Sequence, residues 1–317
     1  MADISLTHSK MLLLAGTANP PLADEIAECL GQPLCQVTSR RFADGEIFVR
    51  IDENVRGQDV FILQPTNPPA ENLVELLLLT DAARRASAAR VTAVVPYFGY
   101  ARQDRKDQPR VAISAKLVSN LITTAGAERV LGLDFHQHQI QGFFDIPVDH
   151  LYASPVFVQH YRQKALKDLV VVAPDVGSAK MARGFAKRLD ASLAIIDKRR
   201  PSANVAEVVN VVGDVSGRDC LIVDDMIDTA GTMSEAVLAL DRLGANDVYC
   251  CASHPLLSGP AIDRLTATPV KEVAVTNTIA VSDDKLFDRL KVLSIAPLLA
   301  QAIRYTHSDQ SVSSLFS

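Results

Sequence analysis

Short apolar runs alternate along this chain with segments whose apolar residues recur at helical spacing. The helical patterns cover residues 21–30, 71–85 and 179–189. The apolar runs cover residues 11–15, 59–63, 91–95, 129–133, 169–173, 193–196, 220–223 and 248–252. Continuous apolar runs are typical of strands buried on both faces of a parallel sheet, and the intervening helices supply the crossovers. The pattern therefore predicts an α/β protein with mostly parallel sheets flanked by helices.

The pattern occurs twice. Residues 11–30 and 170–189 each read as strand, short loop and helix. At a constant offset of 160, four residues of the first half, Gly57, Asp59, Ile62 and Leu63, align with Gly217, Asp219, Ile222 and Val223 of the second. A repeat of this kind predicts two similar domains, which we place at residues 1–150 and 151–317. We expect about the last 20 residues to pack back on the first domain.

Composition limits the possible partners. The chain has 317 residues, 48% of them hydrophobic, and a formal net charge of −5, which disfavours nucleic acid as a partner. The N-terminus lacks the charged and apolar regions of a signal peptide, and the first apolar run is too short for a membrane span. We therefore expect a cytoplasmic protein with no membrane partner. The five cysteines form no C-x-x-C pair, which indicates buried, reduced thiols.

The segment CLIVDDMIDTAGT, residues 220–232, is the strongest candidate site. Its apolar strand is followed by Asp224 and Asp225, then by a loop of small residues that opens a helix. Free N–H groups at a helix start bind anions, while carboxylates accept hydrogen bonds from vicinal hydroxyls or share a divalent cation. This combination favours a sugar phosphate. The chain contains neither a Walker loop nor a G-x-G-x-x-G motif. The alternative is an ordinary strand-to-helix turn capped by Asp and Thr.

The first copy of the repeat lacks this chemistry. It has Gln64, Pro65 and Glu71 where the second copy has two aspartates and a glycine. Only the second half is therefore expected to bind the sugar phosphate.

The segment PYFGYARQDRK combines aromatic and cationic residues directly after a predicted strand. Tyr97, Phe98 and Tyr100 could present a flat apolar face, and Arg102 and Gln103 could hold phosphate or the edge of a base. The alternative is an aromatic strand end followed by a solvated charged loop.

Residues 40–47, RRFADGEI, predict a hairpin with its turn at Asp44 and Gly45. Such a hairpin requires no further function. However, Asp44 and Glu46 flank the glycine and could accept hydrogen bonds from the amine or ribose of a nucleotide.

Further polar residues follow other predicted strands. His136 and His138 would share one face if the preceding strand continued, which suggests a metal pair, although only His136 is retained as a candidate. Asp175 follows the strand at 169–173 and begins an anion-type or metal-type turn. Asp175 and Asp224 both lie at carboxyl ends of parallel strands, where open α/β sheets bind their ligands.

Three cations, Lys198, Arg199 and Arg200, come directly after an apolar strand that we expect to end at Ile196. Phosphoryl transfer requires cations placed in advance to neutralise the charge on the transferring oxygens. The alternative is a solvated basic turn.

Taken together, these motifs closely resemble the ribose-phosphate pyrophosphokinase family. The matching segments span nearly the whole chain and are RFADGE, NVRG, DAARRASA, PYFGYARQDRK, D-x-H-x-x-Q-I-Q-G-F-F-D, PDVG, DKRRP, the loop at 224–232 and SHPLLSG. The resemblance implies two type I phosphoribosyltransferase-like domains. It also implies an Mg²⁺-dependent enzyme of nucleotide biosynthesis that transfers the diphosphoryl group of ATP to the 1-hydroxyl of ribose 5-phosphate. The products would be phosphoribosyl pyrophosphate (PRPP) and AMP.

The resemblance also assigns roles to residues. The ATP contacts would be Asp44, Gly45, Glu46, Arg102 and Gln103. The Mg²⁺ ligands would be His136 and Asp175, and the catalytic residues Lys198 and Arg200. Ribose 5-phosphate would contact Arg200, Asp224, Asp225, Asp228, Thr229, Ala230, Gly231 and Thr232. The resemblance further implies a homohexamer built from dimers, in which the hairpin serves a neighbouring subunit, with activation by phosphate and inhibition by ADP.

The chain departs from the family pattern at a few positions. Ala230 and Ser178 stand where glycine is usual, Ala112 replaces a proline and Phe135 a leucine. None of these is a predicted catalytic group. Two other functions share part of the pattern: a phosphoribosyltransferase that consumes PRPP, and a regulatory homologue without activity. The first needs no adenine site, and the second should have lost residues such as Lys198, so both are disfavoured.

Overall fold

The computed structural model describes residues 9–199 and 208–316. The chain forms two compact units. The first comprises Met1–Tyr152, Thr278–Ala280 and Ala296–Ser317. The second comprises Ala153–Asn277 and Val281–Ile295.

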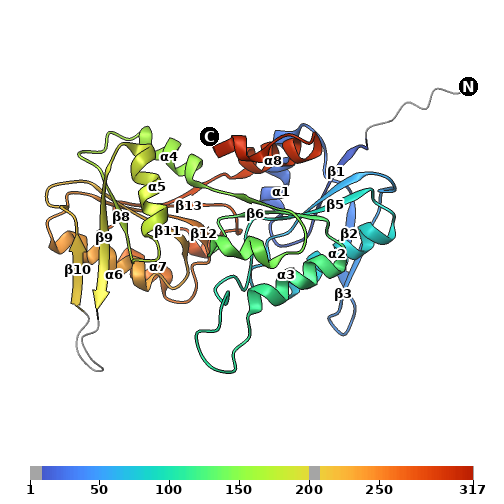
Figure 1. Cartoon of the computed structure of the whole chain (residues 1–317), viewed down its shortest axis with the longest axis horizontal. Coiled ribbons are helices and arrows are strands. Elements are labelled where there is room, and N and C mark those ends of the chain that lie inside the picture. Colours follow the sequence, from blue (N-terminus) through green and yellow to red (C-terminus); the bar gives the residue numbers. More distant parts are fainter. Residues whose placement is uncertain (1–8, 200–207, 317) are drawn as a thin grey trace, which may run out of the picture. The chain divides into compact units, whose positions relative to one another are not determined.

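The first unit contains a parallel sheet in the order β1-β4-β5-β6-β7. Its strands are β1 (Met11–Ala15), β4 (Asp59–Leu63), β5 (Arg90–Val95), β6 (Arg129–Leu133) and β7 (Val148–Leu151). Two helices, α1 (Pro20–Leu30) and α8 (Ala296–His307), cover one face, and α2 (Glu71–Arg85) and α3 (Ser114–Ala125) cover the other (Figure 1). An antiparallel hairpin of β2 (Val37–Arg41) and β3 (Ile47–Ile51) forms a separate small sheet.

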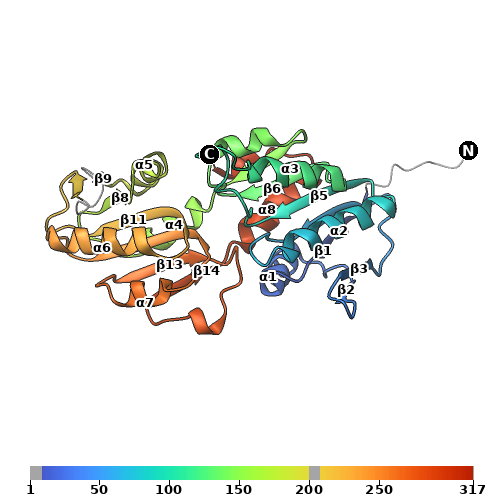
Figure 2. The same cartoon turned by 90° about the horizontal axis from the view of Figure 1, so that it is seen from below.

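The second unit contains a sheet in the order β10-β9-β8-β11-β12-β13-β14, in which only the β9–β10 pair is antiparallel. Its strands are β8 (Val170–Ala173), β9 (Ser192–Arg199), β10 (Val208–Val212), β11 (Cys220–Ile227), β12 (Val248–Pro255), β13 (Glu272–Thr276) and β14 (Leu290–Leu293). Its helices are α4 (Ser154–Arg162), α5 (Ala179–Leu189), α6 (Gly231–Arg242) and α7 (Ala261–Thr266). Figure 2 shows α6 and α7 along the sheet of this unit.

The two units repeat one topology. The strand order β1-β4-β5-β6-β7 of the first recurs as β8-β11-β12-β13-β14 in the second. The turn before the second strand of each series is also shared. Gly57 and Gly217 have φ of +69° and +68°, and their N–H groups donate to the carbonyls of Ser87 (2.8 Å) and Gly244 (2.7 Å). Glycine suits this left-handed backbone because it has no Cβ. The predicted α/β fold with two similar halves is confirmed.

Apolar strand residues form the core of each unit. All five residues of β4 and of β13 are buried, as are all eight of β12. Each fully buried large aliphatic or aromatic side chain stabilises the fold by about 1.5–3 kcal/mol relative to exposure. Four of the five cysteines are buried, and burial is the main reason that the pKa of Cys35 and of Cys220 rises to about 12. The thiols of these two residues are therefore protonated at neutral pH.

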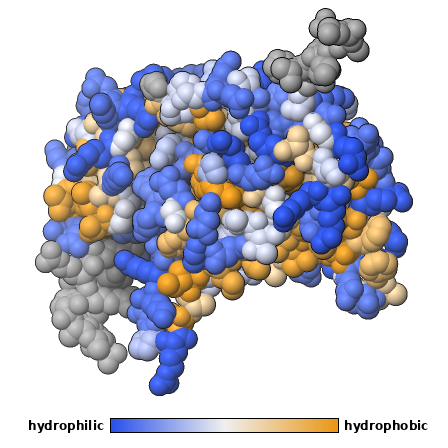
Figure 3. Space-filling view, turned by 45° about the vertical axis from the view of Figure 1, so that its right-hand side comes forward, coloured by the Kyte–Doolittle hydropathy of each residue, from blue (hydrophilic) through white to orange (hydrophobic). Residues whose placement is uncertain are grey.

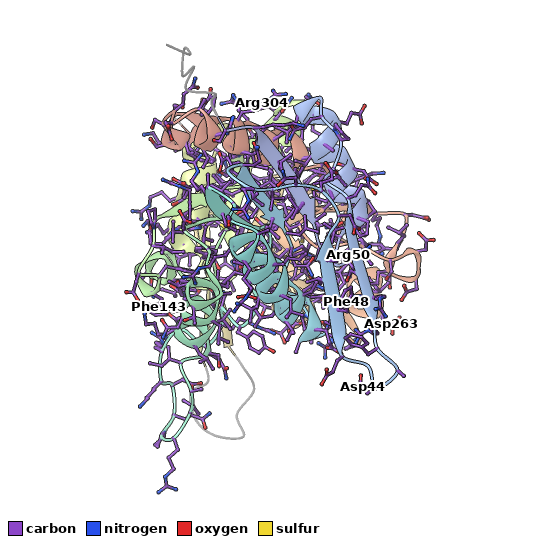
Figure 4. All side chains as sticks on the ribbon, turned by 90° about the vertical axis from the view of Figure 1, so that its right-hand side faces the viewer. Asp44, Phe48, Arg50, Phe143, Asp263 and Arg304 are labelled. Atoms are coloured by element: carbon purple, nitrogen blue, oxygen red, sulfur yellow. The ribbon has the colours of Figure 1, made fainter. Side chains whose placement is uncertain are left out.

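Helix α8 joins the first unit through specific polar contacts. The Arg304 guanidinium, labelled in Figure 4, donates to the carbonyl of Cys29 at the end of α1. Arg90 donates to the carbonyl of Thr306 (3.0 Å), and His307 Nδ1 lies 2.7 Å from the buried carboxylate of Asp59. Along the described ranges, no helix has both the length and the apolar content that a membrane span requires.

Candidate active site

Three acidic residues of the second unit lie where β8 and β11 stop pairing with each other. The pairing of these two strands ends at Ile222 and Val172, and Asp175 follows β8 by two residues, as expected. Asp224 and Asp225 belong to β11 itself, which continues to Ile227 through its pairing with β12. The expectation that these two aspartates come after the strand was therefore wrong. The strand continues because the neighbouring strand on its other side is long enough to pair with it.

The carboxyl group of Asp224 lies in a crowded acidic environment. Burial raises its pKa to about 8, and the negative charges of Asp225 and Asp175 add to the effect. The backbone N–H of Asp225 donates to Asp224 Oδ1 (2.9 Å), which partly opposes the rise. A group of carboxylates in this state is stabilised by a proton, by a cation or by hydroxyl donors of a ligand.

The loop at 228–232 has the geometry of an anion cradle. Helix α6 begins at Gly231, and Ala230 before it adopts a left-handed backbone with φ of 58°. The carbonyls of Ile227 and Asp228 accept hydrogen bonds from Leu257 N (2.9 Å) and Ser258 N (2.8 Å). With these carbonyls turned toward residues 257–258, the N–H groups at the start of α6 are available to an anion.

Arg264 is a further cation beside this cradle, and no local motif marks it as a candidate. It comes from α7, and its Nη1 donates to the carbonyl of Thr229 (3.0 Å). A Cβ at Gly231 would lie 3.4 Å from the same nitrogen. The tertiary fold, not a local motif, brings this guanidinium to the loop. Glycine at 231 keeps the approach open.

The basic segment differs from the sequence expectation. Strand β9 does not end at Ile196 but continues to Arg199, because β10 pairs with it. Lys198 is thus a strand residue whose backbone lies opposite Val209. Arg200 lies outside the described residues. The catalytic roles of Lys198 and Arg200 stay predictions.

In the first unit, the predicted hairpin is present and Asp44 lies at its tip (Figure 4). Gly45 has φ of +96°, and Asp44 Oδ1 accepts the N–H of Glu46 (3.1 Å). An exposed aromatic that the sequence reading did not select, Phe42, lies beside this turn at 44% exposure. The Arg40 guanidinium is 5.1 Å from its ring centroid. The turn thus presents acceptor groups next to a flat aromatic face.

The aromatic segment after β5 is only partly as expected. Tyr97 and Phe98 are buried at 4% and 2% exposure, so they belong to the core and do not offer a ligand-binding face. Tyr100 alone is exposed among the three. Arg102 is exposed in the same loop, and Gln103 is held at the start of α3, where its side-chain oxygen accepts from Ser114 Oγ (2.5 Å).

Strand β6 does not continue through His136 and His138, so the condition under which they would share one face is not met. The strand ends at Leu133, and His138 begins a short 3-10 helix, η1 (His138–Phe143). His136 therefore lies in a connecting loop, which is anchored by a hydrogen bond from Phe135 N to His150 Nε2 (3.0 Å). Within the ranges that the structure describes, no three His, Cys, Asp or Glu side chains are grouped closely enough to hold a metal ion.

The first unit places buried polar side chains beside its loop after β1, the counterpart of the loop after β8 that carries Asp175. Gln64 and Glu75 are buried at 0% and 2% exposure and are joined by a hydrogen bond of 2.8 Å. Glu75 also accepts from both the N–H and the hydroxyl of Thr17 (2.9 and 2.7 Å). A Cβ at Gly16 would lie 2.3 Å from Gln64 Oε1. In the first unit this loop is therefore held by the chain's own side chains.

Fold and site together define a two-unit α/β protein with a helix-start turn beside a group of acids in its second unit. Residues 11–126 match the N-terminal domain of ribose phosphate pyrophosphokinase, and residues 199–317 match the phosphoribosyl synthetase-associated domain. A ribose-phosphate pyrophosphokinase from Synechocystis is 54% identical over 311 residues, covering 98% of this chain and 93% of the relative. One from Caldanaerobacter subterraneus is 54% identical over 310 residues, covering 97% and 98%.

A solved structure supports the same family. Phosphoribosylpyrophosphate synthetase from Mycobacterium smegmatis aligns with a TM-score of 0.89 at 46% identity, covering 95% of this chain and all of that one. The chain belongs to the ribose-phosphate pyrophosphokinase family, whose members are enzymes that make PRPP.

Proposed function

We propose that the chain transfers the β,γ-diphosphoryl group of ATP to the 1-hydroxyl of ribose 5-phosphate, giving PRPP and AMP. The observation that carries this proposal is the cradle at 228–232 beside Asp224 and Asp225, in a chain of this family. The N–H groups at the start of α6 would bind the 5-phosphate. The two carboxylates would accept hydrogen bonds from the ribose hydroxyls.

The bond changes are those of a diphosphoryl transfer. The 1-hydroxyl oxygen bonds to the β-phosphorus of ATP, and the bond from that phosphorus to the α,β-bridging oxygen breaks. AMP leaves with the bridging oxygen, and the hydroxyl proton passes to solvent. Lys198 and Arg200 would place positive charge near the transferring oxygens, which is the main contribution that such a reaction needs from side chains.

ATP would be bound by residues of the hairpin and of the loop after β5. Asp44, Gly45 and Glu46 form a turn with acceptor groups, and the exposed ring of Phe42 adds a surface on which a base can stack. Arg102 would pair with phosphate oxygens, and Gln103 would contact the base or ribose.

Mg²⁺ is the proposed metal cofactor, and the carboxylate of Asp175 is the kind of ligand that suits it. Oxygen ligands suit this ion, which usually keeps several waters and binds through one or two carboxylates and substrate phosphates. The negative charges of Asp225 and Asp175 beside Asp224 support a site where a positive ion would relieve their repulsion. Asp175 and His136 would hold the ion, which when bound neutralises charge on the phosphates of ATP.

We further propose a cytoplasmic homo-oligomer, with a hexamer built from dimers as the expected form. Two exposed apolar residues of α3, Leu117 and Leu121, are spaced by one helical turn at 56% and 39% exposure. Apolar side chains also reach the surface on the face in Figure 3. Light scattering would measure the mass, and a monomer at micromolar concentration would contradict this part of the proposal.

The enzymatic proposal is tested by incubating the chain with ATP, ribose 5-phosphate, Mg²⁺ and phosphate, and measuring AMP and PRPP. Equal amounts of the two products are expected. Lys198→Ala should lower kcat by about 100- to 1,000-fold, because one preplaced charge is lost. The control is Lys187→Ala, an exposed lysine of α5, which should retain wild-type turnover. Folded protein that forms no AMP would refute the diphosphoryl transfer.

A further inference from the structure

Ser178 lies between two acids of the second unit that come from different strands. Its backbone N–H and its hydroxyl both donate to Asp175 Oδ1, at 2.8 and 3.0 Å. The same hydroxyl lies within hydrogen-bond distance of Asp224 Oδ1, at 3.3 Å. Ser178 is the residue that precedes α5, and its side chain is half-buried. One short side chain therefore links the end of β8 to β11.

The hydroxyl can hold both carboxyl groups, although it has only one proton. A serine oxygen offers one donor and two lone pairs, so it donates to one acid at a time and can accept from a protonated partner or a ligand hydroxyl. Asp224 Oδ1 also accepts the N–H of Asp225 (2.9 Å). The hydroxyl of Ser178 and the N–H of Asp225 thus approach the same oxygen of Asp224 and restrict the orientation of its carboxyl group.

We propose that Ser178 is a positioning residue of the ribose site: its hydroxyl orients the carboxyl group of Asp224 toward the sugar and couples it to Asp175. The inference rests on the proposed function, because Asp224 is there a ligand of ribose hydroxyls. Preorganisation of this kind improves affinity because the side chain need not be ordered when the ligand binds. The Ser178 hydroxyl contacts Asp224, the proposed ligand of the ribose, and none of the proposed ATP contacts of the first unit.

A purely structural role for Ser178 makes a different prediction. The bond that stabilises the start of α5 runs from the backbone N–H of Ser178 to Asp175, and it is retained when the side chain is shortened. Ser178→Ala thus removes the hydroxyl bridge and keeps the helix cap. Ser178→Thr keeps both.

The experiment measures ribose 5-phosphate binding by calorimetry without ATP, together with the KM for each substrate. Ser178→Ala is expected to weaken the Kd and raise the KM for ribose 5-phosphate by about 3- to 10-fold. The KM for ATP and the melting temperature should stay at the wild-type values. Ser178→Thr should restore the Kd to within about twofold of the wild type. The control is Ser154→Ala, in the first turn of α4 in the same unit.

Three results would overturn the role of Ser178: a wild-type Kd in Ser178→Ala, an equal rise in the KM of both substrates, or failure of Ser178→Thr to restore binding. These results are separable from failure of the proposed function. If the proposed function were wrong, the wild-type chain itself would neither bind ribose 5-phosphate nor form AMP.

Discussion

At the scale of single residues, the cradle contains a strained alanine. Ala230 adopts φ of 58° and ψ of 11°, a left-handed conformation that brings Cβ too close to the backbone. A non-glycine residue in such a region costs on the order of 1 kcal/mol or more. The conformation persists because the surrounding loop is fixed by other bonds, such as the donation of Ser234 N to the carbonyl of Ala230 (2.9 Å). The chain therefore holds its anion-binding turn without the glycine that favours it.

Ala230→Gly is expected to raise the free energy of unfolding by about 1 kcal/mol, because the strain is released and outweighs the greater entropy of the unfolded chain. The denaturant midpoint measures this change. Ala236→Gly, in the interior of the same helix, is the matched control and should lower stability by about 1 kcal/mol or more. Destabilisation of similar size in both variants would show that Ala230 carries no strain.

At the scale of elements, hydrophobic patterning located the strands but not their ends. The apolar runs correctly placed β11 and β9, yet both strands continue into charged residues, Asp224 and Lys198, since a neighbouring strand supplies hydrogen-bond partners there. At β6, by contrast, the strand ends at Leu133, where its apolar run ends. A strand end depends on the length of its neighbour, which one segment of sequence does not encode. The contact of Ser178 with Asp224 and that of Arg264 with Thr229 likewise arise only through the tertiary fold.

Helix α4 offers a test of electrostatics at the element scale. Glu272 of β13 is nearly buried and receives hydrogen bonds from His160 and Lys164, both at 2.8 Å. Burial alone would raise its pKa, but the bonds from Lys164 and His160 outweigh burial, so the pKa lies below its ordinary value of 4.5. A lowered pKa in the folded state stabilises the fold above the pKa of the unfolded chain. This stabilisation is lost as the pH falls through the folded-state pKa.

Glu272→Gln should therefore lower the free energy of unfolding by about 1–2 kcal/mol at pH 7. The difference from the wild type should shrink as the pH falls below about 4.3, the value for glutamate in an unfolded chain. Urea unfolding at about six pH values between pH 3.5 and 7 would measure this difference in the free energy of unfolding. Glu128→Gln, at an exposed position, should differ little from the wild type throughout. A pH-independent difference would assign the effect of Glu272 to packing.

At the scale of the whole molecule, equivalent residues of the two similar units make different contacts. Each unit has an aspartate at the same place before its second strand, Asp59 in the first and Asp219 in the second. Asp219 accepts the backbone N–H of Lys167, before β8, and the amide of Asn246, before β12, both at 2.6 Å. Asp59 instead binds the Arg90 guanidinium (2.9 and 2.6 Å) and His307 of the C-terminal helix. The same position thus links the segments that enter two neighbouring strands in one unit and holds the C-terminal helix in the other.

This difference predicts separate effects of the two matched substitutions. Asp59→Asn removes the buried carboxylate that pairs with the partly buried Arg90 guanidinium and leaves it the exposed carboxylate of Asp309 (3.3 Å), at a cost of about 2–4 kcal/mol. Amide exchange should accelerate in α8 and β4 while the second unit keeps its protection. Asp219→Asn should accelerate exchange around β11 and leave α8 unchanged. If both variants accelerated amide exchange equally in both units, the anchoring role of Asp59 would be excluded. The loss of protection would then reflect one cooperative unfolding of the whole chain.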